Sequence, residues 1–169
     1  MVTRDSQRGR VYDAEALVRG IFERADEFGA RTVEVHGSQL TLPVERKFAS
    51  VESVQDYADR VLALNWVRAR WPRAATPVTV RARAGSKAAH YEVAGAVLAV
   101  PLHANGSAWA LRELVILHEL AHHLEADSEK CAPHGPEFCD RYLELIDGVI
   151  GPEAALLMRT TMLGCGVRL

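Results

Sequence analysis

The longest helical pattern in the sequence runs from Ser107 to Ala126, and its apolar residues cover most of the circumference of a helix. A helix that is apolar on nearly all sides has to be buried. We therefore expect this helix to lie at the centre of the fold, with the other elements packed around it. One domain is expected, because 169 residues is an ordinary length for one domain.

The rest of the chain alternates between helical and strand patterns. Apolar residues at three- and four-residue steps predict helices, and alternating or β-branched-rich runs predict strands. The expected helices are 13–28, 53–71, 136–150 and 153–163, and the expected strands are 32–35, 40–48, 78–84, 91–93 and 96–100. This order predicts an α+β fold. Residues 1–10 are polar and Arg-rich, so we expect a flexible N-terminal tail followed by a single domain over 11–169.

The central helix contains His118-Glu119-Leu120-Ala121-His122, which is the HExxH pattern. Residues four apart share one face of a helix, so both imidazoles can reach one metal ion while Glu119 addresses the water beside it. Zinc suits two neutral imidazoles. Unpaired polar groups are costly to bury. A bound metal therefore accounts for two histidines and a glutamate on an apolar helix better than the competing interpretation, in which the histidines only make hydrogen bonds in the core. The pattern predicts a Zn²⁺ site with Glu119 as the general base.

Such a site needs a third protein ligand, and several residues qualify. Metzincins carry glycine and histidine three and six residues after the second His, but Glu125 and Ser128 stand there. His134 is favoured, because it begins the next helix after a loop of eleven residues, long enough to return to the metal. The rivals are Cys131, Glu144, Glu137 and Asp140. His123 points about 100° away from His122 on an ideal helix, so we expect it to support the site or face solvent.

A hydrolase built on this motif also needs a group that stabilises the developing oxyanion. By residue type the candidates are Tyr142, His103, Tyr91 and His90. We favour Tyr142 as the second catalytic residue. The alternative for each of these residues is an ordinary role in packing or at the surface, with no part in catalysis.

The sequence resembles a known group at these residues. HELAHH followed by APHGPEF is similar to the HExxH…HG-x-x-aromatic signature of SprT-like zinc metallopeptidases, the group that includes Spartan. Chain length and motif together resemble a narrower family of small actinobacterial HExxH metallohydrolases. The resemblance covers mainly Val97 to Tyr142. It implies a zincin-like fold, in which a small mixed or antiparallel sheet packs on helices around a central HExxH helix.

The resemblance also implies roles for individual residues. It makes His118, His122 and His134 the zinc ligands and Glu119 the catalytic base. It makes the strand 96–100 the edge strand along which an extended peptide would pair. The cysteine-based zinc modules that bring Spartan-type proteins to DNA have no counterpart here, so DNA-dependent proteolysis is not implied.

Composition narrows the alternatives. The net charge of −2 gives no bulk attraction to nucleic acid or to an anionic membrane. Three cysteines without a CxxC pair suggest no disulfide framework and fit a reducing cytoplasm. The sequence has no secretory signal pattern and no apolar run of about 18 residues, so no membrane span is expected. It does not indicate an oligomeric state.

The function expected from the sequence is hydrolysis of peptide or protein substrates by a metallopeptidase. One alternative is a zinc amidohydrolase that acts on a small molecule or a cell-wall fragment. The other is a nucleic-acid-binding protein with a structural zinc. Its contact surface would be the stretch from Arg68 to Lys87, together with Trp66 and Trp71. This stretch lies within 60–91, which has seven basic residues and no acidic one.

Overall fold

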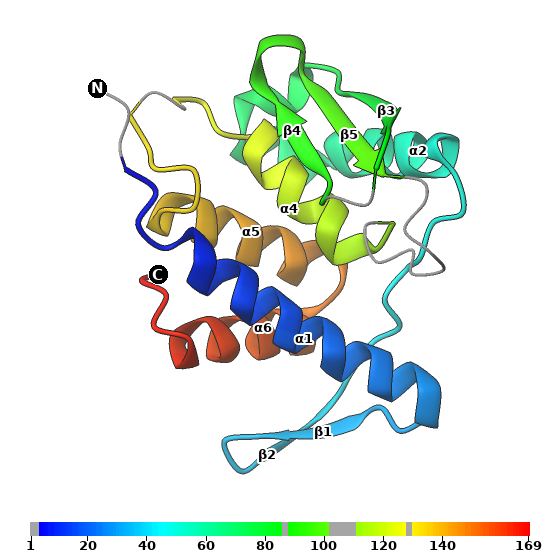
Figure 1. Cartoon of the computed structure of the whole chain (residues 1–169), viewed down its shortest axis with the longest axis vertical. Helices are drawn as coiled ribbons and strands as arrows, with labels where there is room; N and C mark the ends of the chain where they lie inside the picture. The colour runs from blue at the N-terminus through cyan, green and yellow to red at the C-terminus, as the bar shows by residue number, and fades with distance from the viewer. Residues whose placement is uncertain (1–3, 86–87, 102–110, 128–129) are drawn as a thin grey trace. The chain divides into compact units, whose positions relative to one another are not determined.

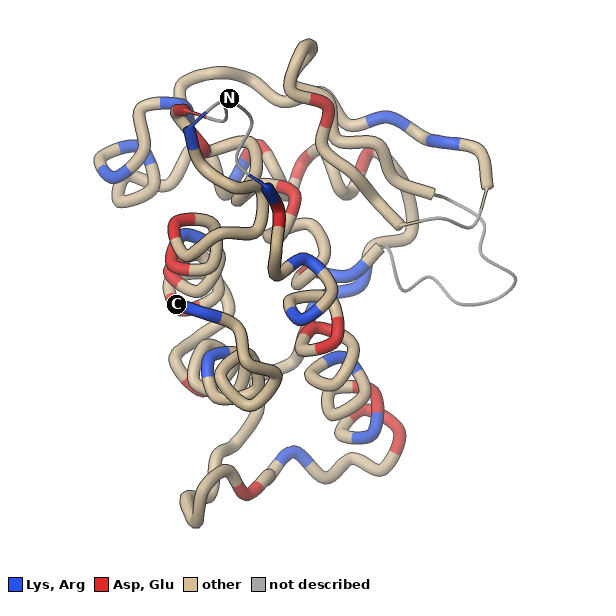
Figure 2. Tube along the Cα trace, turned by 60° about the vertical axis from the view of Figure 1, so that its left-hand side comes forward, with Lys and Arg blue, Asp and Glu red and all other residues tan. Residues whose placement is uncertain are grey.

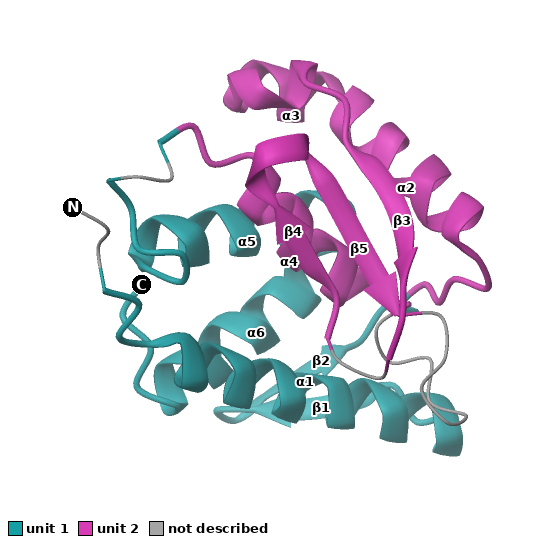
Figure 3. Ribbon diagram, turned by 45° about the horizontal axis from the view of Figure 1, so that its top comes forward, with its two compact units in different colours: residues 1–45, 127–169 teal, residues 46–126 magenta. Residues whose placement is uncertain are grey.

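The computed structural model describes residues 4–85, 88–101, 111–127 and 130–169. Helices are mixed with two small β-sheets over these residues, which confirms the α+β class (Figure 1). The chain divides into two compact units, shown in different colours in Figure 3: unit 1 is Met1–Glu45 with Asp127–Leu169, and unit 2 is Arg46–Ala126. The single domain expected over 11–169 stays a prediction.

Three helices form most of unit 1: α1 (Arg8–Phe28), α5 (Pro136–Val149) and α6 (Pro152–Gly164). Helix α6 contacts both α1 and α5. The helices α5 and α6 each have proline at their first position, where the missing N–H costs no hydrogen bond. Helix α1 buries an apolar stripe at helical spacing, made of Val11, Ala14, Val18, Phe22 and Ala25.

Helix α1 begins earlier than the apolar pattern suggested. We expected a loose tail through residue 10 and a helix from Asp13, but the first helical residue is Arg8. The preceding residue, Gln7, is only 2% exposed. The first turn is polar on its outer side, so periodicity alone did not reveal it. Gly29 ends the helix in the left-handed conformation, at φ 64°.

A hairpin completes unit 1, as expected. Strands β1 (Thr32–Val35) and β2 (Ser38–Thr41) pair in antiparallel orientation. The turn residues His36 and Gly37 both have positive φ, 48° and 80°, which suits the right-handed twist of a two-residue hairpin. The second strand ends at Thr41 instead of reaching Phe48, because Pro43 has no N–H to continue the ladder.

Unit 2 contains a mixed three-stranded sheet in the order β3-β5-β4. Strand β5 (Val97–Pro101) is parallel to β3 (Thr79–Arg83) and antiparallel to β4 (His90–Glu92). The expectation that 96–100 forms an edge strand is therefore wrong, because both edges of β5 are already paired. Its continuous apolar run, with Leu98, Ala99 and Val100 all at 0% exposure, is typical of a strand buried in the middle of a sheet.

The two outer strands of this sheet differ in how their free edges are covered. On β3, the side-chain amide of Gln55 takes the place of a neighbouring strand. Its Oε1 accepts from the Val80 N–H at 2.7 Å, and its Nε2 donates to the Val78 carbonyl at 3.0 Å. Strand β4 pairs only with β5 among the described residues. The outer edge of β4 is therefore the candidate for an added strand.

The long helix expected over 53–71 is two helices, α2 (Val51–Ala63) and α3 (Asn65–Arg70). They separate at Leu64, whose ψ of 132° is extended. The apolar pattern runs across this break because both helices bury apolar side chains. Ser50 is the N-cap of α2, and Ser53 completes a capping box with it.

Helices α2 and α4 (Glu113–His123) lie side by side on one face of this sheet (Figure 3). Helix α2 contacts β3, α4 contacts β4, and the two helices contact each other. Helix α4 is buried around its circumference, as a central helix should be, with Ile116, Leu117 and Leu120 all at 0% exposure. Its expected start at Ser107 lies outside the described residues.

Candidate metal centre

The N-terminal end of α4 is fixed by a buried carboxylate. Glu113 is 1% exposed and accepts three hydrogen bonds, from the Tyr57 hydroxyl at 2.8 Å, the Arg46 N–H at 3.0 Å and the Arg46 guanidinium at 2.6 Å. The hydrogen bond between the Arg46 side chain and Glu113, together with the negative charge of Glu113, raises the pKa of Arg46. An acidic residue in the first turn also compensates the helix dipole. The HExxH segment therefore starts from a firmly anchored helix end.

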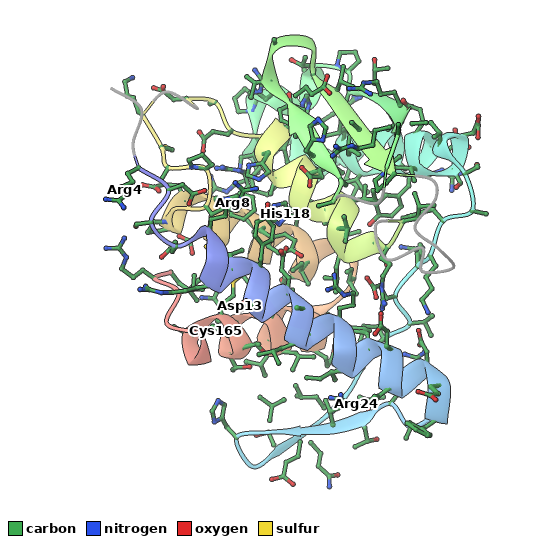
Figure 4. The ribbon with its side chains drawn as sticks, viewed as in Figure 1. Arg4, Arg8, Asp13, Arg24, His118 and Cys165 are labelled. Atoms are coloured by element: carbon green, nitrogen blue, oxygen red, sulfur yellow. The ribbon has the colours of Figure 1, made fainter. Side chains whose placement is uncertain are left out.

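His118 and His122 face each other from successive turns of α4 (His118 is labelled in Figure 4). Their Nε2 atoms are 3.2 Å apart, and their rings are inclined at 68°. Two nitrogens bound tetrahedrally to zinc at about 2.0–2.1 Å would be separated by about 3.3 Å. The observed separation therefore fits two ligands of one ion. His118 is 2% exposed, and His122 is partly exposed.

His134 stands immediately before α5, where Gly135 is the N-cap and Pro136 the first helical residue. Its ring contacts two aromatic rings, with centroid distances of 5.3 Å to Tyr12 and 5.0 Å to Phe138. The side chain is 4% exposed. These contacts and the burial of the side chain restrict movement of the imidazole.

The structure brings the three expected ligands together. One nitrogen from each of His118, His122 and His134 lies within 4.8 Å of the other two. Two buried histidines and one partly exposed histidine at this spacing can bind a metal ion. Among the residues that the structure describes, the rival ligands do not belong to this group. Those rivals are Cys131, Glu137, Asp140 and Glu144.

Glu119 follows His118 on α4 and is 5% exposed. An ideal helix places it about 100° round the axis from His118, and a carboxylate is retained in such a buried position only when it has partners. Its role as general base stays a prediction.

The candidate oxyanion-stabilising residues have different surroundings. Tyr142 is fully buried, and its ring centroid is 5.8 Å from that of Phe138. His90 accepts from Arg83 at 2.9 Å and binds Glu92 at 3.0 Å. His103 lies outside the described residues. The catalytic role of Tyr142 stays a prediction.

Tyr91, the remaining candidate, belongs to a hydrogen-bond network around His123. The Tyr91 hydroxyl lies 2.9 Å from His123 Nδ1, and His123 Nε2 lies 3.0 Å from the Thr76 carbonyl. A carbonyl only accepts, so Nε2 carries the proton and Nδ1 accepts from the hydroxyl. Arg73 donates to Tyr91 at 3.2 Å and to the His123 carbonyl at 2.7 Å.

His123 is 0% exposed, so it does not face solvent. Burial lowers the pKa of its imidazole, which favours the neutral ring that this network requires. The network joins the last turn of α4 to β4 and to the 3₁₀ helix η1 (Pro72–Ala75). It therefore fixes the end of the helix that carries His122. Helical periodicity placed His123 about 100° round the axis from His122 but did not identify these partners.

The three cysteines differ in their surroundings. All three are free thiols, which agrees with the expected absence of a disulfide framework. Cys139 is buried, and burial raises its pKa to about 12, so the thiol stays protonated. Cys131 lines a cavity of about 200 Å³ with Gly135 and Arg168.

The basic residues are partly neutralised by their neighbours. On β3, Arg81 forms an ion pair with Glu92, and Arg83 donates to the Ala88 carbonyl at 2.8 Å. Elsewhere, Figure 2 shows acidic and basic residues interspersed along α1. The ion pair between Arg81 and Glu92 reduces the positive field that a nucleic-acid surface on β3 would need.

Comparison of the chain with protein-family models, curated proteins and solved structures finds no match. Within the described residues, no helix combines the length and the apolar character needed to cross a bilayer. Function therefore has to be inferred from the chemistry of the histidine triad and of Glu119.

Proposed function

We propose that this protein is a zinc-dependent hydrolase of the HExxH type with a zincin-like fold, and that its substrates are peptides or proteins. The observation that carries the proposal is the triad of His118, His122 and His134, whose ligand atoms lie within 4.8 Å of one another. Three imidazoles are a suitable ligand set for zinc. Calcium and magnesium prefer oxygen ligands, so a set made only of nitrogens suits them less well. The resemblance to SprT-like metallopeptidases points to the same three ligands.

In this mechanism each residue has one task. His118, His122 and His134 would hold the zinc ion, which would supply Lewis-acid chemistry by polarising a carbonyl and lowering the pKa of water to about 7. Glu119 accepts the proton of the attacking water and returns it to the leaving amine. Tyr142 is proposed to donate to the developing oxyanion. Burial of Glu119 at 5% exposure would keep bulk water from competing for that proton.

A peptide substrate would dock on β4. Gln55 already occupies the outer edge of β3, and β5 is paired on both sides. An extended peptide that adds a strand to this sheet would therefore pair with β4. Helix α4 packs against the same strand, so the peptide would run close to the helix that carries His118 and His122.

The proposal is tested by a hydrolysis assay on a casein or peptide library with protein purified in zinc-containing buffer. We expect cleavage that stops after treatment with a chelator and returns when one equivalent of zinc is added. The same assay with small amide substrates separates a peptidase from an amidohydrolase. Protein that contains full zinc and cleaves neither kind of substrate would contradict the proposed function.

A further inference from the structure

The segment before α1 holds His134 at two points. Asp5 Oδ2 lies 2.7 Å from His134 Nδ1. The Gln7 side chain donates to the His134 carbonyl at 2.8 Å. Gln7 also accepts from the Arg168 N–H and donates to the Arg168 carbonyl, both at 3.1 Å. The N-terminal segment is thus fastened to the C-terminal end of the chain and to one of the three histidines of the triad.

The contact with Asp5 decides which nitrogen of His134 can bind a metal. A carboxylate only accepts hydrogen bonds, so the proton of the imidazole must sit on Nδ1. The lone pair is then on Nε2. The ring is buried and contacts Tyr12 and Phe138, and turning it over would break its hydrogen bond to Asp5. The segment therefore presents Nε2 of His134 in one fixed direction.

The second oxygen of the Asp5 carboxylate gives a reason to expect positive charge near this ring. Asp5 Oδ1 is buried and has no hydrogen-bond partner among the described residues. A buried carboxylate oxygen without a partner is costly unless positive charge lies near it. A neutral imidazole supplies one hydrogen bond and no charge. A cation on the far nitrogen of His134 would make the ring electropositive and offset this cost.

We infer that Asp5 is a positioning residue for the metal, acting through His134. Carboxylate–histidine–metal arrangements of this kind fix the tautomer of the ring and raise its basicity as a ligand. This inference rests on the proposed function, because it requires that His134 bind an ion. It assigns a role in the site to the N-terminal segment.

The first test uses the wild-type protein without metal and needs no variant. Long-range proton–nitrogen NMR correlations distinguish the two neutral tautomers of a histidine. We expect His134 to carry its proton on Nδ1. A proton on Nε2 would overturn the inference, whether or not the protein binds zinc.

The second test compares zinc affinity in two variants with the same change of charge. Asp5→Asn removes the carboxylate that faces His134, and Asp13→Asn removes an exposed carboxylate on α1 (Figure 4). Competition with a chromophoric chelator gives the zinc Kd of each. We expect Asp5→Asn to bind zinc about 10–100-fold more weakly than wild type, and Asp13→Asn to match wild type. Thermal unfolding of the metal-free variants shows whether Asp5→Asn is folded.

The outcomes separate this inference from the proposed function. If wild type binds zinc tightly and Asp5→Asn binds it within twofold of wild type, Asp5 does not position the ligand and only the inference fails. The same holds if Asp5→Asn lowers the melting temperature without weakening zinc binding. If wild type binds no zinc, the proposed function fails, and the inference fails with it.

Discussion

The substitution Glu119→Gln is expected to leave zinc binding intact and to lower kcat for peptide hydrolysis by about 10²–10⁴-fold, the usual contribution of a positioned general base. The amide has nearly the same size as the carboxylate but cannot accept the proton of the attacking water at neutral pH. Substrate contacts are unchanged, so KM should change little. The measurement is steady-state hydrolysis of a fluorogenic peptide, with zinc content determined on the same samples.

The matched control for this variant is Glu52→Gln, which makes the same change at an exposed position in the first turn of α2. This variant should keep the kcat of wild type. A Glu119→Gln protein with full zinc and undiminished kcat would remove Glu119 from the mechanism. The zinc measurement also matters, because loss of metal together with activity would assign Glu119 a structural task instead.

The second large effect is on stability. A ligand present at a thousand times its Kd stabilises the folded state by about 4 kcal/mol. For a chain of this size, 1 kcal/mol corresponds to about 2–4 °C in Tm, so saturating zinc should raise the Tm of wild type by about 8–16 °C. His122→Ala removes one of three ligands, and we expect most of this rise to disappear. Differential scanning calorimetry of metal-free and zinc-loaded samples measures both.

The control for His122→Ala is His36→Asn, at the exposed turn of the β1–β2 hairpin. Asparagine tolerates the positive φ of 48° found there, so the fold should be kept. This variant should show the full rise of Tm with zinc. An equal rise in His122→Ala would mean that zinc binds elsewhere on the chain.

The histidine triad could be predicted from the sequence because its geometry is largely local. The spacing of His118 and His122 fixes two imidazoles on one face of any helix. The Gly135-Pro136 pair after His134 marks the start of a helix, which placed the third ligand at a defined point. The choice of His134 over Cys131 rested on loop length and on the resemblance. In the structure, a ligand atom of His134 lies within 4.8 Å of those of His118 and His122.

Other features depend on contacts that no local pattern encodes. The apolar run of β5 predicted a strand but did not reveal that strands would pair on both its sides. The break at Leu64 interrupts a pattern that stays apolar across it. Asp5 lay in a segment whose polar composition suggested a tail, and its carboxylate reaches a residue 129 positions away. Such contacts become visible only when the fold is known.

The most direct test of the metal site is anomalous X-ray diffraction at the zinc edge, on crystals grown with one equivalent of zinc. The account predicts a single strong peak about 2.0–2.1 Å from one nitrogen each of His118, His122 and His134. A map with no peak at these histidines, or with zinc bound only by other side chains, would contradict it.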